Sequence, residues 1–291
     1  MRAIAGFIMR SRFTAITVVA APALLPLLFW LSGAALALVA LRRGPSEGAL
    51  VMAGATLLLG VISAGLIGTP LAALQPLLLI WLPVLLLALV LRATVSLART
   101  LETGALVAAA GVLVFHVLHP DPAAFWTRVL EQVALLMGGD PAAETWQRAT
   151  AELAPMLTGL WAVNMLALAV ASLLLGRWWQ ALLYNPGGFR AEFHELRLEV
   201  WFTGIAVAAA ALALFTPAGL VRDLSLVLTG VFVLQALAVV HALFARRGWH
   251  GGWLVGVYLL LPLALRPVAA LGIADVFLDL RRRFAGPSGQ A

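Results

Sequence analysis

Seven stretches of this chain contain no Asp, Glu, Arg or Lys, and together they make up most of its 291 residues. They are residues 13–41, 48–91, 103–120, 153–176, 200–221, 224–245 and 248–265. A helix of a soluble domain needs a polar face, and these stretches have none, so they belong in lipid or against one another in lipid. The sequence therefore predicts a polytopic membrane protein.

The composition agrees with this prediction. Hydrophobic residues make up 63% of the chain and charged residues 11%, with a mean hydropathy of +1.02, whereas soluble domains are about 45–50% apolar. We therefore expect residues 1–291 to form a single integral membrane domain. The basic residues are all Arg, and they lie mostly between the apolar stretches. This placement favours contact with anionic lipid head groups and gives no indication of nucleic-acid binding.

Two missing residue types limit the chemistry of the chain. It contains no Cys, which excludes disulfides, thiolate zinc sites and thiol nucleophiles, and no Lys, which excludes a Walker-type phosphate loop and Schiff-base chemistry. His194-Glu195 lacks the second His of a zinc-protease motif, and His116 and His119 have no sure third ligand. The sequence therefore predicts no enzymatic activity, no cofactor and no metal site.

Dividing the apolar stretches into spans of about 20 residues predicts the helices. Gly68-Thr69-Pro70 breaks the longest stretch, and Pro217-Ala218-Gly219 predicts a turn between two later helices. The predicted helices cover residues 4–22, 25–41, 49–67, 72–92, 102–118, 153–176, 199–216 and 220–245, followed by an apolar run from Trp253 to Leu280.

Two of these assignments leave an alternative open. Residues 13–41 are long for one span and short for two, so they form either two helices or one span kinked at Pro22 and Pro26. The last run carries Arg266 between two prolines, and it forms either one broken span or two short ones. The predicted fold class is an all-α, polytopic transmembrane helical bundle of about eight spans, seven to nine, with short amphipathic surface helices.

Two polar segments interrupt the apolar pattern. In the insert 119–152 apolar residues recur at helical spacing, and Gly138-Gly139-Asp140-Pro141 divides it, which predicts two amphipathic helices on a membrane surface. In the loop 177–198 we expect a turn at Asn185-Pro186-Gly187-Gly188 and then a charged helix over 190–199.

The distribution of Arg predicts the orientation of the spans. If the helices alternate, several Arg clusters fall on one side, which the positive-inside rule makes cytoplasmic. The loop 177–198 is then cytoplasmic and the acidic insert 119–152 lies outside. The clusters on the cytoplasmic side are Arg42-Arg43, Arg92 with Arg99, Arg177 with Arg190 and Arg197, and Arg246-Arg247.

Small residues recur in the predicted helices and permit close helix packing. Helices packed in this way can also line a cavity for a substrate. These residues are Gly54, Ala55, Gly60, Ala64, Gly65, 108–111 and 208–211.

Polar side chains inside a membrane are expensive, so each one is a candidate site residue. Asn164 and Gln235 either contact a ligand or form hydrogen bonds between helices. Arg266 either holds an anionic substrate or pairs with a carboxylate. The carboxylates considered for Arg266 are Asp223, Asp275 and Asp279. We select Arg266, Asn164, Gln235 and His241 as candidate ligand-binding residues, and we name no catalytic residue.

Two segments carry a resemblance to a known family. Asn185-Pro186-Gly187-Gly188-Phe189-Arg190, and the ending from Leu271 to Arg282 with its Gly-Asp-Asp-Arg pattern, resemble the YybS-like family of uncharacterised bacterial inner-membrane proteins. The similarity covers nearly the whole chain. It implies a multi-pass protein of the bacterial inner (plasma) membrane and no established activity.

A second resemblance, less extensive, is to the substrate-binding S-components of energy-coupling-factor transporters. It rests on Leu36–Arg43, Gly44-Pro45 and the small residues from Gly48 to Gly54, and the chain departs from it in having more spans and a polar insert. The resemblance implies a small-molecule solute and a separate ATPase as partner. The alternative is a non-transporting scaffold that binds another membrane protein through its polar loops.

Overall fold

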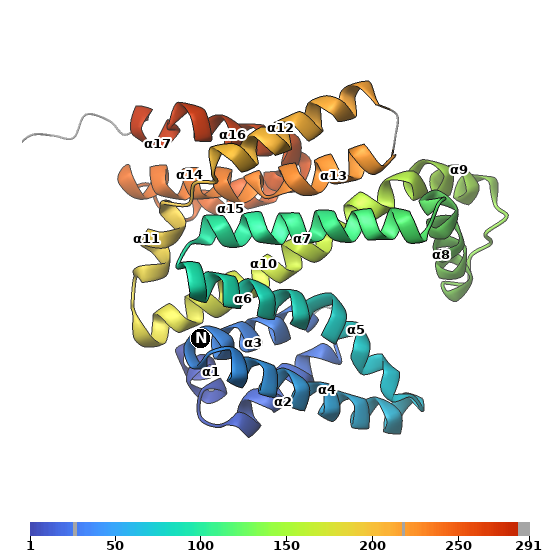
Figure 1. The fold of residues 1–291 in the computed structure, drawn as a ribbon, viewed down its shortest axis with the longest axis horizontal. Helices are drawn as coiled ribbons and strands as arrows, with labels where there is room; N and C mark the ends of the chain where they lie inside the picture. Colours follow the sequence, from blue (N-terminus) through green and yellow to red (C-terminus); the bar gives the residue numbers. More distant parts are fainter. Residues whose placement is uncertain (26–27, 217–218, 285–291) are drawn as a thin grey trace, which may run out of the picture. The chain divides into compact units, whose positions relative to one another are not determined.

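The structure is a computed structural model that describes residues 1–25, 28–216 and 219–284. In these ranges the chain forms helices joined by short loops, and no strand is present (Figure 1). The predicted all-α fold is therefore confirmed. Two of the predicted features, Pro26 and most of the turn at Pro217-Ala218-Gly219, lie outside the described residues.

Several helical segments are long and apolar enough to cross a membrane. Among the described residues there are five of them, or up to seven when two sharply bent helix pairs are each counted as one span. The prediction was about eight, and part of the difference is the 16-residue apolar helix 200–215, which is shorter than a typical span. The five segments are Pro45–Ile67, Pro70–Thr94, Leu97–Leu118, Glu144–Tyr184 and Gly219–Arg246.

The surface of these segments is apolar. In the most apolar stretch of Pro45–Ile67, 28% of the residues are buried, and Leu57, Val61 and Leu66 are each more than 70% exposed. Soluble proteins rarely expose contiguous apolar surface of this extent. The helices are therefore those of a protein whose outer surface is compatible with lipid.

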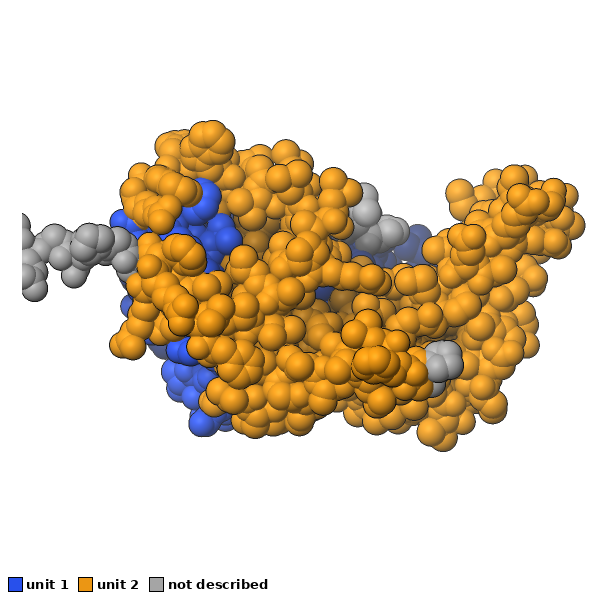
Figure 2. Space-filling model, turned by 90° about the horizontal axis from the view of Figure 1, so that it is seen from above, with its two compact units in different colours: residues 1–104, 165–197, 238–246 blue, residues 105–164, 198–237, 247–291 orange. Residues whose placement is uncertain are grey.

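The chain divides into two compact units, coloured separately in Figure 2. Unit 1 consists of residues 1–104, 165–197 and 238–246, and unit 2 of residues 105–164, 198–237 and 247–291. The helices α7 (Leu97–Leu118), α10 (Leu157–Tyr184) and α14 (Phe232–Arg246) contribute residues to both units.

Unit 1 is built around α3, in which every residue from Ser32 to Leu41 is buried. α3 packs against α2, α4 and α6, and Gly176 of α10 approaches the backbone of Ala34 so closely that a Cβ atom would lie 2.7 Å from its carbonyl oxygen. The elements that lie wholly within unit 1 are α1 (Arg2–Ile8), α2 (Arg12–Ala23), α3 (Phe29–Arg43), α4 (Pro45–Ile67), η1 (Pro70–Ala73), α5 (Leu74–Pro76), the π-helical turn η2 (Leu77–Trp81), α6 (Leu82–Thr94) and α11 (Gly188–His194).

The first predicted helix, residues 4–22, is wrong. The chain bends by 116° between α1 and α2, and Ser11 starts α2 with a capping box in which its side chain and that of Thr14 each accept a backbone hydrogen bond from the other's residue. These reciprocal bonds satisfy backbone N–H groups at a new helix start, so the helix cannot continue through Ser11. The second predicted helix, 25–41, corresponds to α3.

The predicted break at Gly68-Thr69-Pro70 is confirmed. Gly68 ends α4 with a φ of 75°, a conformation that favours glycine, and the Thr69 side chain accepts a hydrogen bond from the Leu71 backbone N–H. Pro70 then begins η1, where its missing N–H leaves no hydrogen bond unmade.

Unit 2 contains the polar insert and the C-terminal helices. The insert forms the two predicted helices, α8 and α9, with Gly138 at a φ of 73° between them. α12 and α13 pack side by side. The elements are α8 (Pro122–Leu136), α9 (Glu144–Leu153), η3 (Ala154–Met156), α12 (Val200–Phe215), α13 (Gly219–Gly230), α15 (Trp253–Leu260), η4 (Leu261–Leu263), α16 (Leu265–Leu278) and α17 (Leu280–Arg283).

Two further expectations are resolved by the structure. The last apolar run is broken, with a bend of 110° between Trp253–Leu263 and Leu265–Leu278. The helix predicted over 190–199 is wrong, because α11 ends at His194 and the chain is not helical from Leu196 to Glu199. Leu196 and Leu198 are both buried on this stretch, which is the alternation of an extended segment rather than a helical face.

Candidate functional site

A histidine and an aspartate pair inside unit 2. His116 lies near the end of α7 and Asp223 near the start of α13, and His116 Nε2 is 2.9 Å from Asp223 Oδ2. The His116 side chain is 16% exposed and that of Asp223 is 1% exposed. Both residues belong to segments long and apolar enough to cross a membrane. Ionisable groups in such segments are rare and mark functional sites by default.

Glycine allows the helices that carry this pair to approach each other. A Cβ atom added at Gly159 of α10 would lie 2.7 Å from Asp223 Oδ1 and 3.0 Å from the Asp223 Cα atom. Real side chains do not tolerate such distances, so a larger residue at position 159 would push α10 and α13 apart. The close contact excludes other groups from this side of the carboxylate.

Arg222 precedes Asp223 in the sequence, and its guanidinium group is held by one hydrogen bond. Its Nη2 donates a hydrogen bond of 2.9 Å to the carbonyl oxygen of Pro155. Its Nε is buried and has no hydrogen-bond partner among the described residues. The neighbouring Asp223 carboxylate interacts with His116, with the charge of Arg222 and with the Gly159 backbone.

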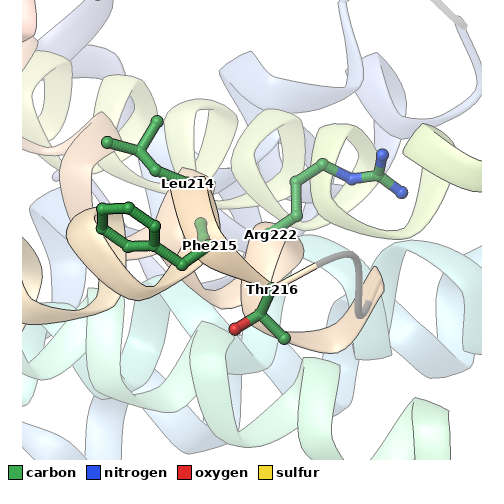
Figure 3. Close-up of a pocket in the computed structure, with 5 residues that line it drawn as sticks. Leu214, Phe215, Thr216 and Arg222 are labelled. Carbon is green, nitrogen blue, oxygen red and sulfur yellow. The ribbon is translucent and has the colours of Figure 1, made fainter.

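An open hollow of about 360 Å³ lies beside Arg222. Figure 3 shows Leu214 and Phe215 on one side and the extended Arg222 side chain on the other, its guanidinium directed away from them. Thr216 adds a hydroxyl group. The hollow thus combines an apolar wall, one hydroxyl and one permanent positive charge, which is the usual composition of a small-molecule site.

An aromatic cluster lies where α7 meets the insert. Its members are Phe115, His119, Phe125, Trp126 and Trp161. The His119 ring stacks on Phe115 with ring centres 4.4 Å apart, and Trp126 Nε1 donates to Thr158 Oγ1. Among the described residues no group of three or more His, Asp or Glu side chains is arranged to hold a metal ion.

A second buried polar network in unit 2 joins Gln235, Asp275 and Arg281. Gln235 accepts a hydrogen bond from the Leu198 backbone N–H and donates one of 3.0 Å to Asp275 Oδ2. Asp275 also accepts from the Leu280 N–H at 3.0 Å and forms an ion pair with Arg281 at 3.2 Å. All the side chains in this network are buried. Because its contacts join α14, α16 and α17, we assign it to holding the C-terminal helices in place.

The four residues selected from the sequence lie in different surroundings. Gln235 is fully buried in the network just described, whereas Asn164 and Arg266 are exposed. His241 belongs to unit 1, where its ring makes an edge contact with Phe193 at 5.6 Å. The three carboxylates considered as partners of Arg266 instead contact other residues.

Arginine side chains in unit 1 hold the ends of helices. Arg92 Nη1 donates to the Leu41 carbonyl oxygen at 2.7 Å, and Arg43 Nη2 donates to the Met9 carbonyl oxygen at 2.6 Å. The last carbonyl groups of a helix lack intrahelical partners, and positive charge there is favourable. Part of the Arg-rich side predicted to be cytoplasmic is therefore structural.

A further ion pair of unit 1 joins Arg177 of α10 to Glu192 of α11 at 2.9 Å. Burial raises the pKa of the Glu192 carboxyl, and the positive charge of Arg177 opposes this shift. The pair fixes α11 against the end of α10 and has no link to the hollow of unit 2.

Sequence reasoning missed the role of Arg222 and Asp223. The two charges separate the uncharged stretches 200–221 and 224–245, and Asp223 was considered only as a partner of Arg266. They are three and four residues beyond Gly219, where α13 starts. An adjacent Arg-Asp inside an otherwise apolar stretch of more than forty residues was the available signal.

Comparison of the chain with family models, with curated proteins and with solved structures finds no match.

Proposed function

We propose that this chain is a transporter-like, multi-pass membrane protein that binds a small oxyanion, a carboxylate or a phosphate, in the hollow beside Arg222. The observation that carries the proposal is the permanent positive charge of Arg222 in the lining of an open space of about 360 Å³. A guanidinium presents several donors in a fixed planar fork that matches an oxyanion. One N–H group is already used on Pro155, which orients the fork.

The surroundings support a small ligand. Hollows that take small molecules are about 300–1,000 Å³ in volume, with a few placed polar groups among apolar ones. Leu214, Phe215 and Thr216 supply this lining. The neighbouring Asp223 carboxylate is buried and makes its hydrogen bond to His116, so the Arg222 guanidinium keeps donors for an anion.

Replacing Arg222 by glutamine tests this proposal. The purified full-length protein in detergent is titrated with succinate, phosphate and sulfate in turn. We expect the wild-type protein to bind at least one of them and Arg222→Gln to bind it at least about tenfold more weakly, because a hydrogen bond to a charged group contributes about 1.5–3 kcal/mol.

Arg128→Gln is the matched control, because Arg128 is an exposed arginine of the same unit. It should bind as the wild type does. Equal affinity in Arg222→Gln and the wild type, or an equal loss in both variants, would contradict a site at Arg222.

A scaffold function is a second candidate, favoured by the end of α8. Leu135, Leu136 and Met137 are 63%, 87% and 80% exposed there, which is typical of a surface that contacts lipid or another protein. The partner we propose on this candidate is a separate ATPase subunit or another membrane protein.

Leu136→Gln separates the two candidate functions. On the scaffold hypothesis the variant, cross-linked in native membranes and analysed by mass spectrometry, should lose a protein that the wild type retains. Leu263→Gln, which changes an equally exposed leucine of η4, should keep it. Identical cross-linked proteins from all three chains would leave α8 as a lipid-contacting surface.

The family and location belong to the same proposal. The Asn185–Arg190 segment and the C-terminal Gly-Asp-Asp-Arg pattern support membership of the YybS-like family, and the Arg-rich loops support the bacterial inner membrane with those loops in the cytoplasm. The likeness to S-components is further support for a solute-binding role.

A further inference from the structure

The two oxygens of the Asp223 carboxylate differ in their surroundings. Oδ2 lies 2.9 Å from His116 Nε2, while Oδ1 is buried against the backbone of Gly159. A buried carboxylate with few hydrogen-bond donors is costly when it carries charge. Binding a proton or a cation would therefore lower the free energy of the carboxylate.

The space around Oδ1 decides whether a proton or a metal cation can bind there. Gly159 lies so close that even one added carbon atom would be 2.7 Å from Oδ1. A metal cation needs several further oxygen ligands at about 2.0–2.6 Å, and the described residues offer no such group. A proton needs no further ligands and no extra room.

The charged groups that face Asp223 are few. α7 contributes His116 and α13 contributes Arg222, both of which act on the carboxylate electrostatically. α10 and η3 contribute backbone, at Gly159 and Pro155. The next histidine of α7, His119, is held on Phe115 by ring stacking. Protons on His116 and Asp223 are therefore bound by the pair as a unit.

We propose that His116 and Asp223 form one proton-binding site, and that its proton strengthens oxyanion binding in the adjacent hollow. The second half of this inference rests on the proposed function. The His116 side chain is 16% exposed, so the pair is not completely enclosed by the protein. The site would make the protein responsive to pH and would couple proton uptake to solute binding.

The sign of the coupling follows from the charges. Without the proton, the pair carries one negative charge and Arg222 one positive charge, so the site is neutral overall. Proton uptake leaves Arg222 uncompensated, and the site then attracts an anion. Affinity for an oxyanion should therefore rise as the pH falls through the titration of the pair. By linkage, binding the anion must also take up a proton.

Sulfate is a suitable probe because its charge does not change between pH 5 and pH 8. We expect the full-length protein to bind sulfate on the order of tenfold more tightly at pH 5 than at pH 8. Asp223→Asn and His116→Gln should each remove most of this pH dependence. His250→Gln, which changes an exposed histidine of unit 2, should retain it. A wild-type affinity that is independent of pH overturns the coupling and leaves the proposed function standing.

Proton binding by the pair can also be measured in the absence of an anion. The chain has five histidines, so the nuclear magnetic resonance signal of ¹⁵N-labelled His116 can be assigned by its loss in His116→Gln. We expect the pH dependence of this signal to differ between the wild type and Asp223→Asn, because Nε2 of the ring lies 2.9 Å from Asp223 Oδ2. An identical pH dependence in the two proteins overturns the proton site. If Asp223→Asn does not fold, Asp223→Ser, which also removes the carboxylate, takes its place with the same expected and overturning results.

If sulfate, succinate and phosphate all fail to bind at any pH, the proposed function fails. The histidine titration then still decides whether the pair binds a proton as a unit.

Discussion

Replacing Gly272 by alanine is expected to lower the free energy of unfolding by about 3 kcal/mol or more, the upper end of what overpacking costs. A Cβ atom at this position would lie 2.0 Å from the carbonyl oxygen of Phe232. Phe232 is the first residue of α14, and Gly272 is buried in α16. The obstructing atom belongs to the backbone, so no side-chain rotation relieves the contact and the two helices must separate.

Thermal unfolding of the detergent-purified protein, followed by tryptophan fluorescence, measures this effect. Gly256→Ala is the control, because Gly256 is also a helical glycine of unit 2 but has no atom within 4 Å of an added Cβ. Alanine there should be neutral or stabilise by about 0.5–1 kcal/mol through its higher helix propensity. A Gly272→Ala protein as stable as Gly256→Ala would show that α16 does not pack on α14 in this way.

Replacing Asp275 by alanine is expected to destabilise the protein by about 3–5 kcal/mol, since it removes one partner of a buried ion pair. The carboxylate accepts from Gln235, from the Leu280 N–H and from Arg281. Without it, the Arg281 guanidinium keeps its charge inside the unit, where its side chain is 10% exposed. The expected consequence is that α17 detaches and unfolding occurs at a lower temperature.

A double variant separates the lost charge from the lost packing. In Asp275→Leu/Arg281→Met both charges are replaced by apolar groups of similar size, and part of the stability should return. Asp279→Asn is the single control, because its partner Arg282 is largely exposed and Asn also accepts the left-handed backbone conformation at this position. An Asp279→Asn protein that is as unstable as Asp275→Ala would contradict the special role of Asp275.

The buried charges also show why the selected site residues were incomplete. Sequence alone marked Arg266 as the most costly intramembrane charge, yet Arg266 is exposed at the bend before α16. Arg281, which was not selected as a site residue, is buried against Asp275. Whether an arginine meets a carboxylate or solvent depends on the path of the chain around bends, and the local composition does not contain that path.

The positions of close helix packing also depended on the tertiary structure. Gly65 and Gly111, which the sequence marked for close packing, have no atom within 4 Å of an added Cβ. Gly54, also marked, does lie close to Ile16, and the tight approaches to backbone atoms occur at Gly159, Gly176 and Gly272, which were not marked. A glycine is equally small wherever it occurs, so its importance depends on which face of its helix meets another helix.

The amino-acid sequence by itself determined the all-α class, most helix positions, the break at Gly68 and the two helices of the insert. These features depend on local properties, namely the length of uncharged stretches and the conformational preferences of glycine and proline. The tertiary structure decided the pairing of His116 with Asp223 and the network around Asp275. Those contacts join residues up to 107 positions apart, and their energy depends on burial and distance, which arise only when the helices pack.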